Sequence, residues 1–308
     1  MKNHLKKILT NFLKIAVTAF LFWWLSRSVN IKELLAYFAS IPLWLVAAVF
    51  GLSLLNVGGQ ALRFLYSVHL LMPLFTFKQG VIAHFSGFAF RLILPGSVGE
   101  VGKVFLLPGD NKTRFYTFLI DAFYSTGVMF FFFGVSTWLL YPKMWYMLGF
   151  CLIFFVFFWI YRLLVRTTGF KKHVPEHVPY FKFGVANITF TSFTLISYIM
   201  QYWLLMKDYG MTLFEQTKVC FFILGVGSIP LSFAGIGFRE NAAQHALSAY
   251  GVPSEAAVGA ALFIFFINVL VPALVGVILL TFVSDIKLKD LKKMIKKQEE
   301  KDLKRKTN

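Results

Sequence analysis

Two long stretches of the chain carry no charged residue, and they limit what it can fold into. Residues 144–161 and 256–284 contain no Lys, Arg, Asp, Glu or His. Because a helix needs about 20 apolar residues to cross the hydrocarbon core of a bilayer, such stretches indicate transmembrane helices. Charged residues make up only 15% of the chain, against about 25% in a typical soluble domain. The sequence therefore predicts an all-α polytopic membrane protein.

Apolar runs and the basic residues between them predict both the spans and their direction. Cytoplasmic loops carry an excess of Lys and Arg, so the basic segment 162–182 is placed inside and the nearly uncharged loop 141–143 outside. Both termini are basic, which predicts a multi-pass protein of the cytoplasmic (inner) membrane with both termini in the cytoplasm. Six full spans are expected, at residues 8–25, 43–62, 115–140, 144–161, 185–206 and 257–284.

This orientation leaves two segments that must enter and leave the membrane on the same side. Residues 79–102 would begin and end inside, whereas residues 215–250 would begin and end outside. A helix over residues 79–94 would be about 24 Å long, shorter than the roughly 30 Å hydrocarbon core. Pro95-Gly96 then interrupts it. We therefore predict two re-entrant helical hairpins; the alternative is that these segments cross fully.

A short motif recurs in the two predicted hairpins. The spacing P-x-S-x4-G joins Pro95, Ser97 and Gly102, and also Pro230, Ser232 and Gly237. The two halves of the chain that hold these copies, residues 1–141 and 142–284, have opposite predicted orientations. Inverted repeats with broken helices are typical of transporters. We expect one membrane domain over residues 1–284, arranged as an inverted repeat, and a basic cytoplasmic tail at 285–308.

Irregular backbone at membrane depth predicts a polar space inside the protein. Such backbone is tolerated in a membrane only where it is buried in protein or lines a water-filled cavity. Helices that begin after Pro95-Gly96 and near residues 235–237 would direct N–H groups into this space, where they favour an anion. Ser97 and Ser232 could cap these helices. The alternative is that the prolines and glycines only kink two packed helices.

Five charged residues lie in or beside the predicted hairpin breaks. Each would cost about 2.5–3.5 kcal/mol at the bilayer centre, so none is expected to face lipid unpaired. One hypothesis is that the three cations attract a lipid phosphate, while the two glutamates hold the cations in place or carry a proton. The alternatives are structural ion pairs and, for Lys103, snorkelling to the interface. The five residues are Arg91, Glu100, Lys103, Arg239 and Glu240.

Two other sets of polar residues are candidates for lining the cavity. Asn56, Gln60 and Arg63 recur at positions i, i+4 and i+7, which places them on one face of a helix. Hydrogen bonds between helices are the alternative role for Asn and Gln. Asp121 stands alone in its predicted span, so it should face the interior and a cation; a purely structural pair is the alternative.

Several functional classes are excluded by what the sequence contains. The net charge of +17 comes from basic ends and short loops, a pattern that favours anionic lipid surfaces and argues against nucleic-acid binding. His84 and His245 lack the spacing of metal ligands, so neither a metal nor a cofactor is expected. The chain has no G-x-x-x-x-G-K-[ST] motif and no evident nucleophile–base pair. We expect neither ATP-driven pumping nor enzymatic activity.

Two motifs carry a resemblance to a known family. The chain reads "ILPGSVGEVGKVFLL" at residues 93–107 and "GSIPLSFAGIGFRENAAQHALSAYGVP" at 227–253. Together with the apolar segment that contains Asp121, these resemble the signature regions of the flippase-like membrane domain of lysylphosphatidylglycerol synthases. The resemblance spans nearly the whole chain. It implies functional roles for Pro95, Gly96, Gly99, Glu100, Pro230, Gly235, Gly237, Arg239 and Glu240.

The resemblance also implies a function. It suggests a flippase or scramblase that moves an anionic or aminoacylated phospholipid, or a polyprenyl-phosphate carrier, between leaflets. The alternative is a non-transporting membrane partner that presents a lipid carrier to a glycosyl- or aminoacyl-transferase. Family members often have arginine where this chain has Lys103. Lysine also attracts phosphate, but it cannot donate the pair of parallel hydrogen bonds that an arginine guanidinium donates. No soluble aminoacyl-transfer domain is evident, so lipid aminoacylation by these residues is not expected.

Overall fold

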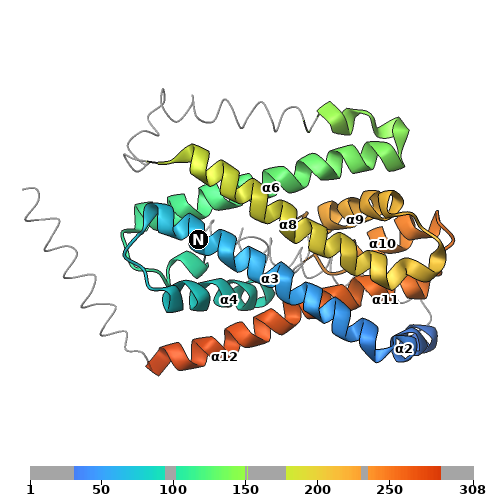
Figure 1. Cartoon of the computed structure of the whole chain (residues 1–308), viewed down its shortest axis with the longest axis horizontal. Coiled ribbons are helices and arrows are strands. Elements are labelled where there is room, and N and C mark those ends of the chain that lie inside the picture. The colour runs from blue at the N-terminus through green and yellow to red at the C-terminus, as the bar shows by residue number, and fades with distance from the viewer. Residues whose placement is uncertain (1–30, 94–101, 150, 152–177, 230–234, 286–308) are drawn as a thin grey trace, which may run out of the picture.

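The computed structural model describes residues 31–93, 102–149, 151, 178–229 and 235–285. These residues form helices and no strands (Figure 1). The α-helices are α2 (Ile31–Ser40), α3 (Leu43–Leu71), α4 (Phe77–Ile93), α6 (Asn111–Leu140), α8 (Tyr180–Met206), α9 (Leu213–Gly227), α10 (Phe238–Ser248), α11 (Ser254–Phe265) and α12 (Val271–Asp285). Three short elements also lie in the described part, η1 (Pro142–Met144), η3 (Lys207–Tyr209) and the π-helical η4 (Phe266–Leu270).

Within the described residues, four helical stretches are long and apolar enough to cross a membrane. They are Leu43–Leu71, Asn111–Leu140, Tyr180–Tyr209 and Ser254–Leu280. Each overlaps one of the spans predicted at 43–62, 115–140, 185–206 and 257–284. The chain is therefore an all-α, multi-pass membrane protein. The predicted span at 8–25 and most of the one at 144–161 lie outside the described residues.

Helix α3 continues well beyond its predicted end at residue 62. The sequence placed the span at 43–62 from the extent of the apolar run, although the spacing of Asn56, Gln60 and Arg63 placed Arg63 on the same helical face. In the structure only 14% of the Arg63 side chain is exposed, and the helix continues to Leu71. Its 29 residues give a length of about 43 Å, which exceeds the roughly 30 Å core, so the helix either tilts or extends beyond the core.

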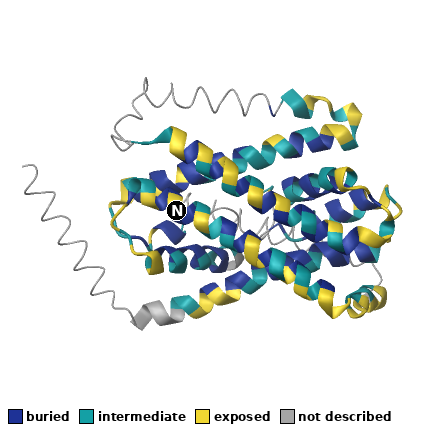
Figure 2. Ribbon diagram, in the orientation of Figure 1, coloured by how far each residue is buried: buried dark blue, intermediate teal, exposed yellow. Residues whose placement is uncertain are grey.

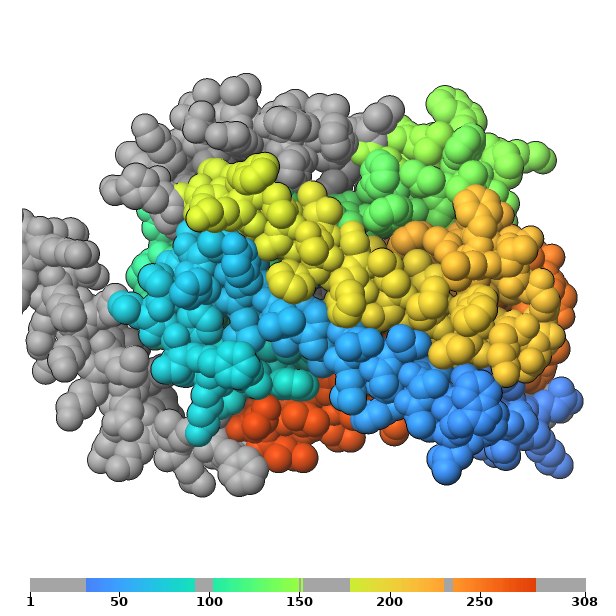
Figure 3. Space-filling model, in the orientation of Figure 1, coloured from blue at the N-terminus to red at the C-terminus, as the bar shows by residue number. Residues whose placement is uncertain are grey.

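Helices α3 and α8 form a central antiparallel pair. They lie side by side across one face of the molecule, with α6 along one edge and α12 along the other (Figures 1 and 3). Their outward faces carry exposed apolar side chains such as Leu54, Leu62 and Ile196, while the inward faces are buried (Figure 2). Contiguous exposed apolar surface of this kind fits contact with lipid tails.

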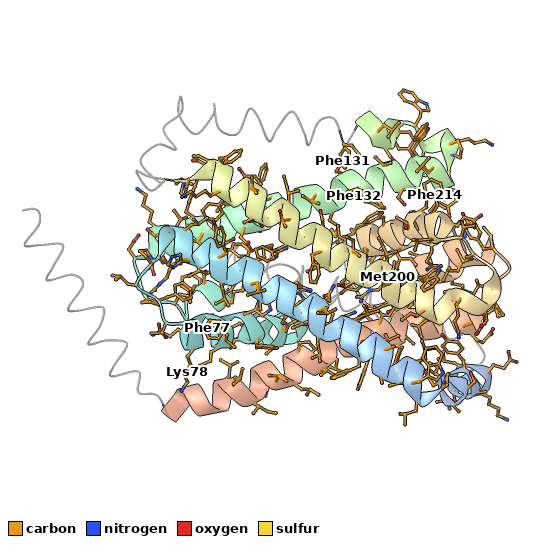
Figure 4. All side chains as sticks on the ribbon, in the orientation of Figure 1. Phe77, Lys78, Phe131, Phe132, Met200 and Phe214 are labelled. Atoms are coloured by element: carbon orange, nitrogen blue, oxygen red, sulfur yellow. The ribbon has the colours of Figure 1, made fainter. Side chains whose placement is uncertain are left out.

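Two short helices, α4 and α9, begin at opposite ends of the molecule. Phe77 and Phe214, in the first turns of α4 and α9, mark these two ends (Figure 4). Helix α4 packs along α12, and the fit depends on Gly276, where an added methyl group would overlap the backbone of Phe85. Helix α9 packs against α6 and then against α10, which follows it in the chain.

The last span is interrupted by one π-helical turn. Pro272 follows η4 closely and has no N–H to donate, which accounts for a break in the regular hydrogen-bond pattern. The Ser53 hydroxyl donates to the carbonyl of Ile267 across a distance of 3.0 Å. Asn268 is fully buried and exchanges two hydrogen bonds with Gln201 of α8. Polar side chains of α3 and α8 thus provide hydrogen-bond partners for the Ile267 carbonyl and the Asn268 side chain at this irregular turn.

Candidate functional site

The polar face of α3 predicted from the sequence points toward α8. Asn56 Nδ2 donates to the Thr194 carbonyl at 2.8 Å, and Gln60 Nε2 donates to Asn56 Oδ1 at 2.7 Å. Arg63 Nη1 donates to the Thr191 hydroxyl at 3.2 Å. Of the two roles considered for this face, hydrogen bonding between helices and lining a cavity, each applies to different residues. Asn56 bonds between helices, whereas Gln60 and Arg63 also line a cavity.

Asp121 of α6 is buried beside these residues. Its Oδ1 lies 3.5 Å from Arg63 Nε, and only 4% of its side chain is exposed. The Ser67 hydroxyl donates to the same oxygen at 2.8 Å, and Asn187 Nδ2 donates to Ser67 at 3.3 Å. The pair therefore joins three helices, because Arg63 lies in α3, Asp121 lies in α6 and the Thr191 hydroxyl of α8 accepts a hydrogen bond from Arg63. Asp121 itself does not line the cavity.

The cavity lies between α3, α4 and the segment that starts at residue 102. Its volume is about 30 Å³, which is room for one or two water molecules. Helix α4 supplies residues at positions i, i+3, i+4 and i+7, which share one helical face. The lining residues are Gln60, Arg63, His84, Gly87, Phe88, Arg91 and Lys103.

Lys103 is almost wholly buried at this cavity. Its ammonium lies 4.4 Å from the centre of the Phe64 ring, an orientation in which the ring face attracts the cation. Gly87 allows this approach, because an added Cβ would lie 3.0 Å from Cδ of Lys103. Asp121, Arg63 and Arg91 are all within electrostatic range of the ammonium. Lys103 thus lies in the interior of the protein.

Arg91 and Arg239 extend the positive charge toward the second predicted hairpin. The Arg91 guanidinium lies 5.6 Å from the centre of the Phe88 ring, and that of Arg239 lies 4.8 Å from the centre of the Phe265 ring. The two arginines are within electrostatic range of each other and of Tyr198. The cations of both predicted hairpins therefore converge on one region.

The start of α10 already holds a carboxylate from the chain itself. Gly235 and Gly237 have positive φ angles of 77° and 87°, which glycine adopts readily. Glu240 is fully buried, and its Oε2 accepts a hydrogen bond of 2.6 Å from the Gly237 N–H. The sequence reasoning expected a lipid anion at this helix end. In the structure Glu240 occupies the position, while Arg239 extends toward Gly227 and Gly235.

The predicted site residues fall partly within and partly outside the described part of the chain. The described residues include the candidates Arg91, Lys103, Gly235, Gly237, Arg239 and Glu240, together with Asn56, Gln60, Arg63 and Asp121. Their roles in binding a headgroup remain predictions. The other candidates lie outside the described residues and are Pro95, Gly96, Ser97, Gly99, Glu100, Pro230 and Ser232.

Sequence reasoning missed a second polar face and a buried histidine. Asn187, Thr191 and Thr194 recur at i, i+4 and i+7 in α8, the same spacing as the polar face of α3 that they contact. Comparing the two spans would have revealed the matched pattern. The buried histidine could have been found in the same way, because His84, Gly87 and Arg91 are at positions i, i+3 and i+7 of α4 and so share one face.

The lining of the cavity is mainly cationic, which is the chemistry that suits an anion. Three cations and one amide line it, aromatic rings form part of the wall, and the nearest placed carboxylate, Asp121, is engaged by Arg63. Phosphate oxygens accept the hydrogen bonds that Arg and Lys donate. Within the described part of the chain, His, Cys, Asp and Glu form no group of three or more that could hold a metal ion.

Comparison with known proteins identifies the family of the chain. The family described as the lysylphosphatidylglycerol synthase TM region matches residues 11–276. A comparison with curated proteins finds no match. The family match includes all four helical stretches long enough to cross a membrane except for the last residues of Ser254–Leu280. The chain therefore belongs to the lysylphosphatidylglycerol synthase TM region family.

Proposed function

We propose that this protein moves an anionic lipid between the two leaflets of the membrane and binds its phosphate at the buried cationic cluster. The cluster is defined as Arg63, Arg91, Lys103 and Arg239. The substrate class is an anionic or aminoacylated phospholipid, or a polyprenyl-phosphate carrier. The activity is transport without catalysis by the chain itself. One observation carries the proposal, namely that Arg63, Arg91 and Lys103 meet at one interior cavity.

The charge balance of the cluster supports anion binding. Asp121 and Glu240 are the carboxylates placed near these four cations, and Glu240 accepts a hydrogen bond from the start of α10. Phosphate oxygens accept the charge-assisted hydrogen bonds that guanidinium and ammonium groups donate. Four cations against two carboxylates among the described residues therefore favour an anionic ligand.

The packing of the short helices supports re-entrant hairpins arranged as an inverted repeat. In the first half α3 is followed by α4 and then by α6; in the second half α8 is followed by α9, α10 and the final span. Helix α4 packs on the final span of the second half, and α9 packs on the final span of the first half. This exchange, with the two short helices starting at opposite ends, fits a repeat with inverted orientation.

The distribution of surface charge supports the proposed orientation. Helices α4, α6 and α8 all begin at one end of the molecule (Figure 1), where Lys78, Lys112 and Lys182 lie. Asp110 also lies at that end, at the start of α6, whereas the opposite end carries both lysines and carboxylates, among them Asp208 and Glu215. An excess of lysine favours the cytoplasmic side. We place the end that holds the starts of α4, α6 and α8 in the cytoplasm.

Transport requires the cavity to widen. A volume of about 30 Å³ holds water and is too small for a phosphate group with its attached glycerol. Lys103 has a long flexible side chain that fills the space above Gly87. We propose that it gives way to the headgroup and then pairs with it. The alternating exposure of one central site is the mechanism used by inverted-repeat transporters.

The test is a leaflet-exchange assay in liposomes with Lys103→Gln and a matched control. Lys207→Gln also removes a lysine that lies on an aromatic ring, with its ammonium 4.6 Å from the centre of the Trp44 ring, but Lys207 is exposed. Loss of one charge-assisted hydrogen bond of about 1.5–3 kcal/mol should slow exchange of labelled phosphatidylglycerol roughly 10- to 100-fold. The control should exchange it at the wild-type rate.

Two results would contradict the proposal. Folded wild-type protein that does not accelerate exchange is not a scramblase or downhill flippase for that lipid. If it nevertheless co-purifies with a glycosyl- or aminoacyl-transferase, the role of a non-transporting partner takes precedence. Equal slowing by Lys103→Gln and Lys207→Gln would mean that the buried cluster has no special part in transport.

A further inference from the structure

His84 is a buried histidine without a hydrogen-bond partner of good geometry. Its side chain is 5% exposed and lines the cavity, and neither Nδ1 nor Nε2 makes a hydrogen bond within the described residues. The Val57 backbone carbonyl is a nearby acceptor. Buried polar groups are nearly always paired, and the Val57 carbonyl can engage only one of the two ring nitrogens, so the other requires an explanation. A ligand that enters the cavity would give that nitrogen a hydrogen-bond partner.

The surroundings of His84 disfavour its charged form while the cavity holds no anion. The rings of Phe64, Phe85 and Phe88 lie with centroids 6.0, 5.5 and 5.3 Å from that of the imidazole. Apolar walls of this kind give a proton on the ring little solvation.

Charged groups approach His84 from several elements. The cations are Arg63 of α3, Arg91 of its own helix α4 and Lys103 of the segment that starts at residue 102. Asp121 of α6 is paired with Arg63. The residues of α12 that pack on α4, around Gly276, carry no titratable group. Glu100 lies outside the described residues. The placed charges nearest to His84 are therefore mainly positive.

We propose that His84 takes up a proton when an anion enters this cavity, so that anion and proton bind together. The inference rests on the proposed function and adds a coupling to it. An arriving anion offsets the repulsion from Arg63, Arg91 and Lys103, and it gives the ring an acceptor for a donated hydrogen bond. A proton then moves from solvent to a ring nitrogen, and neutral imidazole becomes imidazolium. Anion binding and protonation favour each other by linkage.

The ligand chemistry is a tetrahedral oxyanion with at least one negative charge. A lipid phosphodiester and a free inorganic anion both supply it. Neither dihexanoyl-phosphatidylglycerol nor sulfate titrates between about pH 6 and 8, the range in which histidine does. Any proton taken up during their binding therefore comes from the buffer and binds to a group of the protein. Comparing the two probes distinguishes a lipid site from a site for free anions.

The experiment is isothermal titration calorimetry of the full chain in detergent, in two buffers with different ionisation enthalpies. The buffer dependence of the heat gives the number of protons taken up per anion bound. We expect uptake of up to about one proton and an affinity that falls by up to about tenfold per pH unit as the pH rises. Binding of phosphatidylglycerol alone identifies a lipid site, whereas binding of sulfate as well identifies a general oxyanion site; the proton uptake is expected in both cases.

Two variants assign the proton. His84→Gln keeps a polar side chain of similar length that cannot titrate, and it should bind the anion with no proton uptake and no pH dependence. His69→Gln, an exposed histidine in α3, should keep both. Anion binding without proton uptake, or uptake that persists in His84→Gln, would overturn the coupling and leave the proposed function intact. If neither probe binds, the coupling and the anion site are both wrong.

Discussion

Arg63 of α3 and Asp121 of α6 form an ion pair inside the protein, with 3.5 Å between Nε and Oδ1 and both side chains mostly buried. Ser67 and Thr191 hydrogen-bond to the two partners. The pair holds together three helices that can cross a membrane and fixes the position of Arg63 at the cavity. It also explains why a span can continue past an arginine.

Asp121→Asn should destabilise the protein strongly. Removing one partner of a buried ion pair leaves an uncompensated charge and costs about 3–5 kcal/mol. A lower melting temperature in detergent would show the loss. Asp208→Asn, at an exposed position in η3, is the control and should melt as wild type does. The double variant Arg63→Gln, Asp121→Asn should lose less stability than the two single variants lose together. If its loss equals or exceeds the sum of the two single losses, the direct pairing is not what stabilises the site.

Gly235→Ala should disrupt the break between α9 and α10. Its φ angle of 77° disfavours any side chain, and an added methyl group would overlap the carbonyl of Gly227. Gly210→Ala separates the strain of a positive φ angle from the overlap with Gly227, because Gly210 has a φ angle of 67° with open space around it. The control should lose about 1 kcal/mol from strain alone. Gly235→Ala should lose more in thermal melting, and equal losses would show that the contact with Gly227 does not matter.

The start of α9 should lose stability in acid through Glu215. The Thr212 hydroxyl and backbone N–H both hydrogen-bond to the carboxylate, which holds the pKa of Glu215 below its usual value. A lowered folded-state pKa means that the stabilisation is complete above the unfolded-state pKa of about 4.3 and is lost as the pH falls through the lower folded-state value.

Melting of wild type and Glu215→Gln at several pH values tests this. The variant should be less stable at neutral pH, and the difference should shrink as the pH falls below about 4. Thr212→Ala should show the same trend because it removes the hydroxyl donor. A difference between wild type and Glu215→Gln that does not change with pH would mean that the carboxylate charge plays no part in capping α9.

The sequence predicts the spans and the polar face of α3 because both follow from local patterns. Long apolar runs and the spacing of Asn56, Gln60 and Arg63 can be read from the chain alone. The single charge in the run 115–140 likewise predicts a partner for Asp121, although pattern alone does not name Arg63. The end of α3 was misplaced because compensation of the Arg63 charge depends on residues far away in the chain.

The rest of the site depends on tertiary contacts. His84 is an ordinary position in an apolar helix until Lys103 and Arg63 are placed beside it. Glu240 reads as a headgroup or proton site in sequence, whereas its hydrogen bond to the Gly237 N–H depends on the backbone conformation at the start of α10. The π-helical turn at Phe266–Leu270 is compatible with Pro272, but the partners Ser53 and Gln201 come from other helices.

Native mass spectrometry of lipids retained by the purified protein tests most directly whether the buried cationic cluster binds an anionic headgroup. Wild type, offered equal amounts of phosphatidylglycerol and phosphatidylcholine, should retain the anionic lipid preferentially. Arg91→Gln combined with Lys103→Gln should abolish that preference, whereas Lys207→Gln should keep it. Equal retention of the two lipids by wild type, or an unchanged preference in the double variant, would contradict the account.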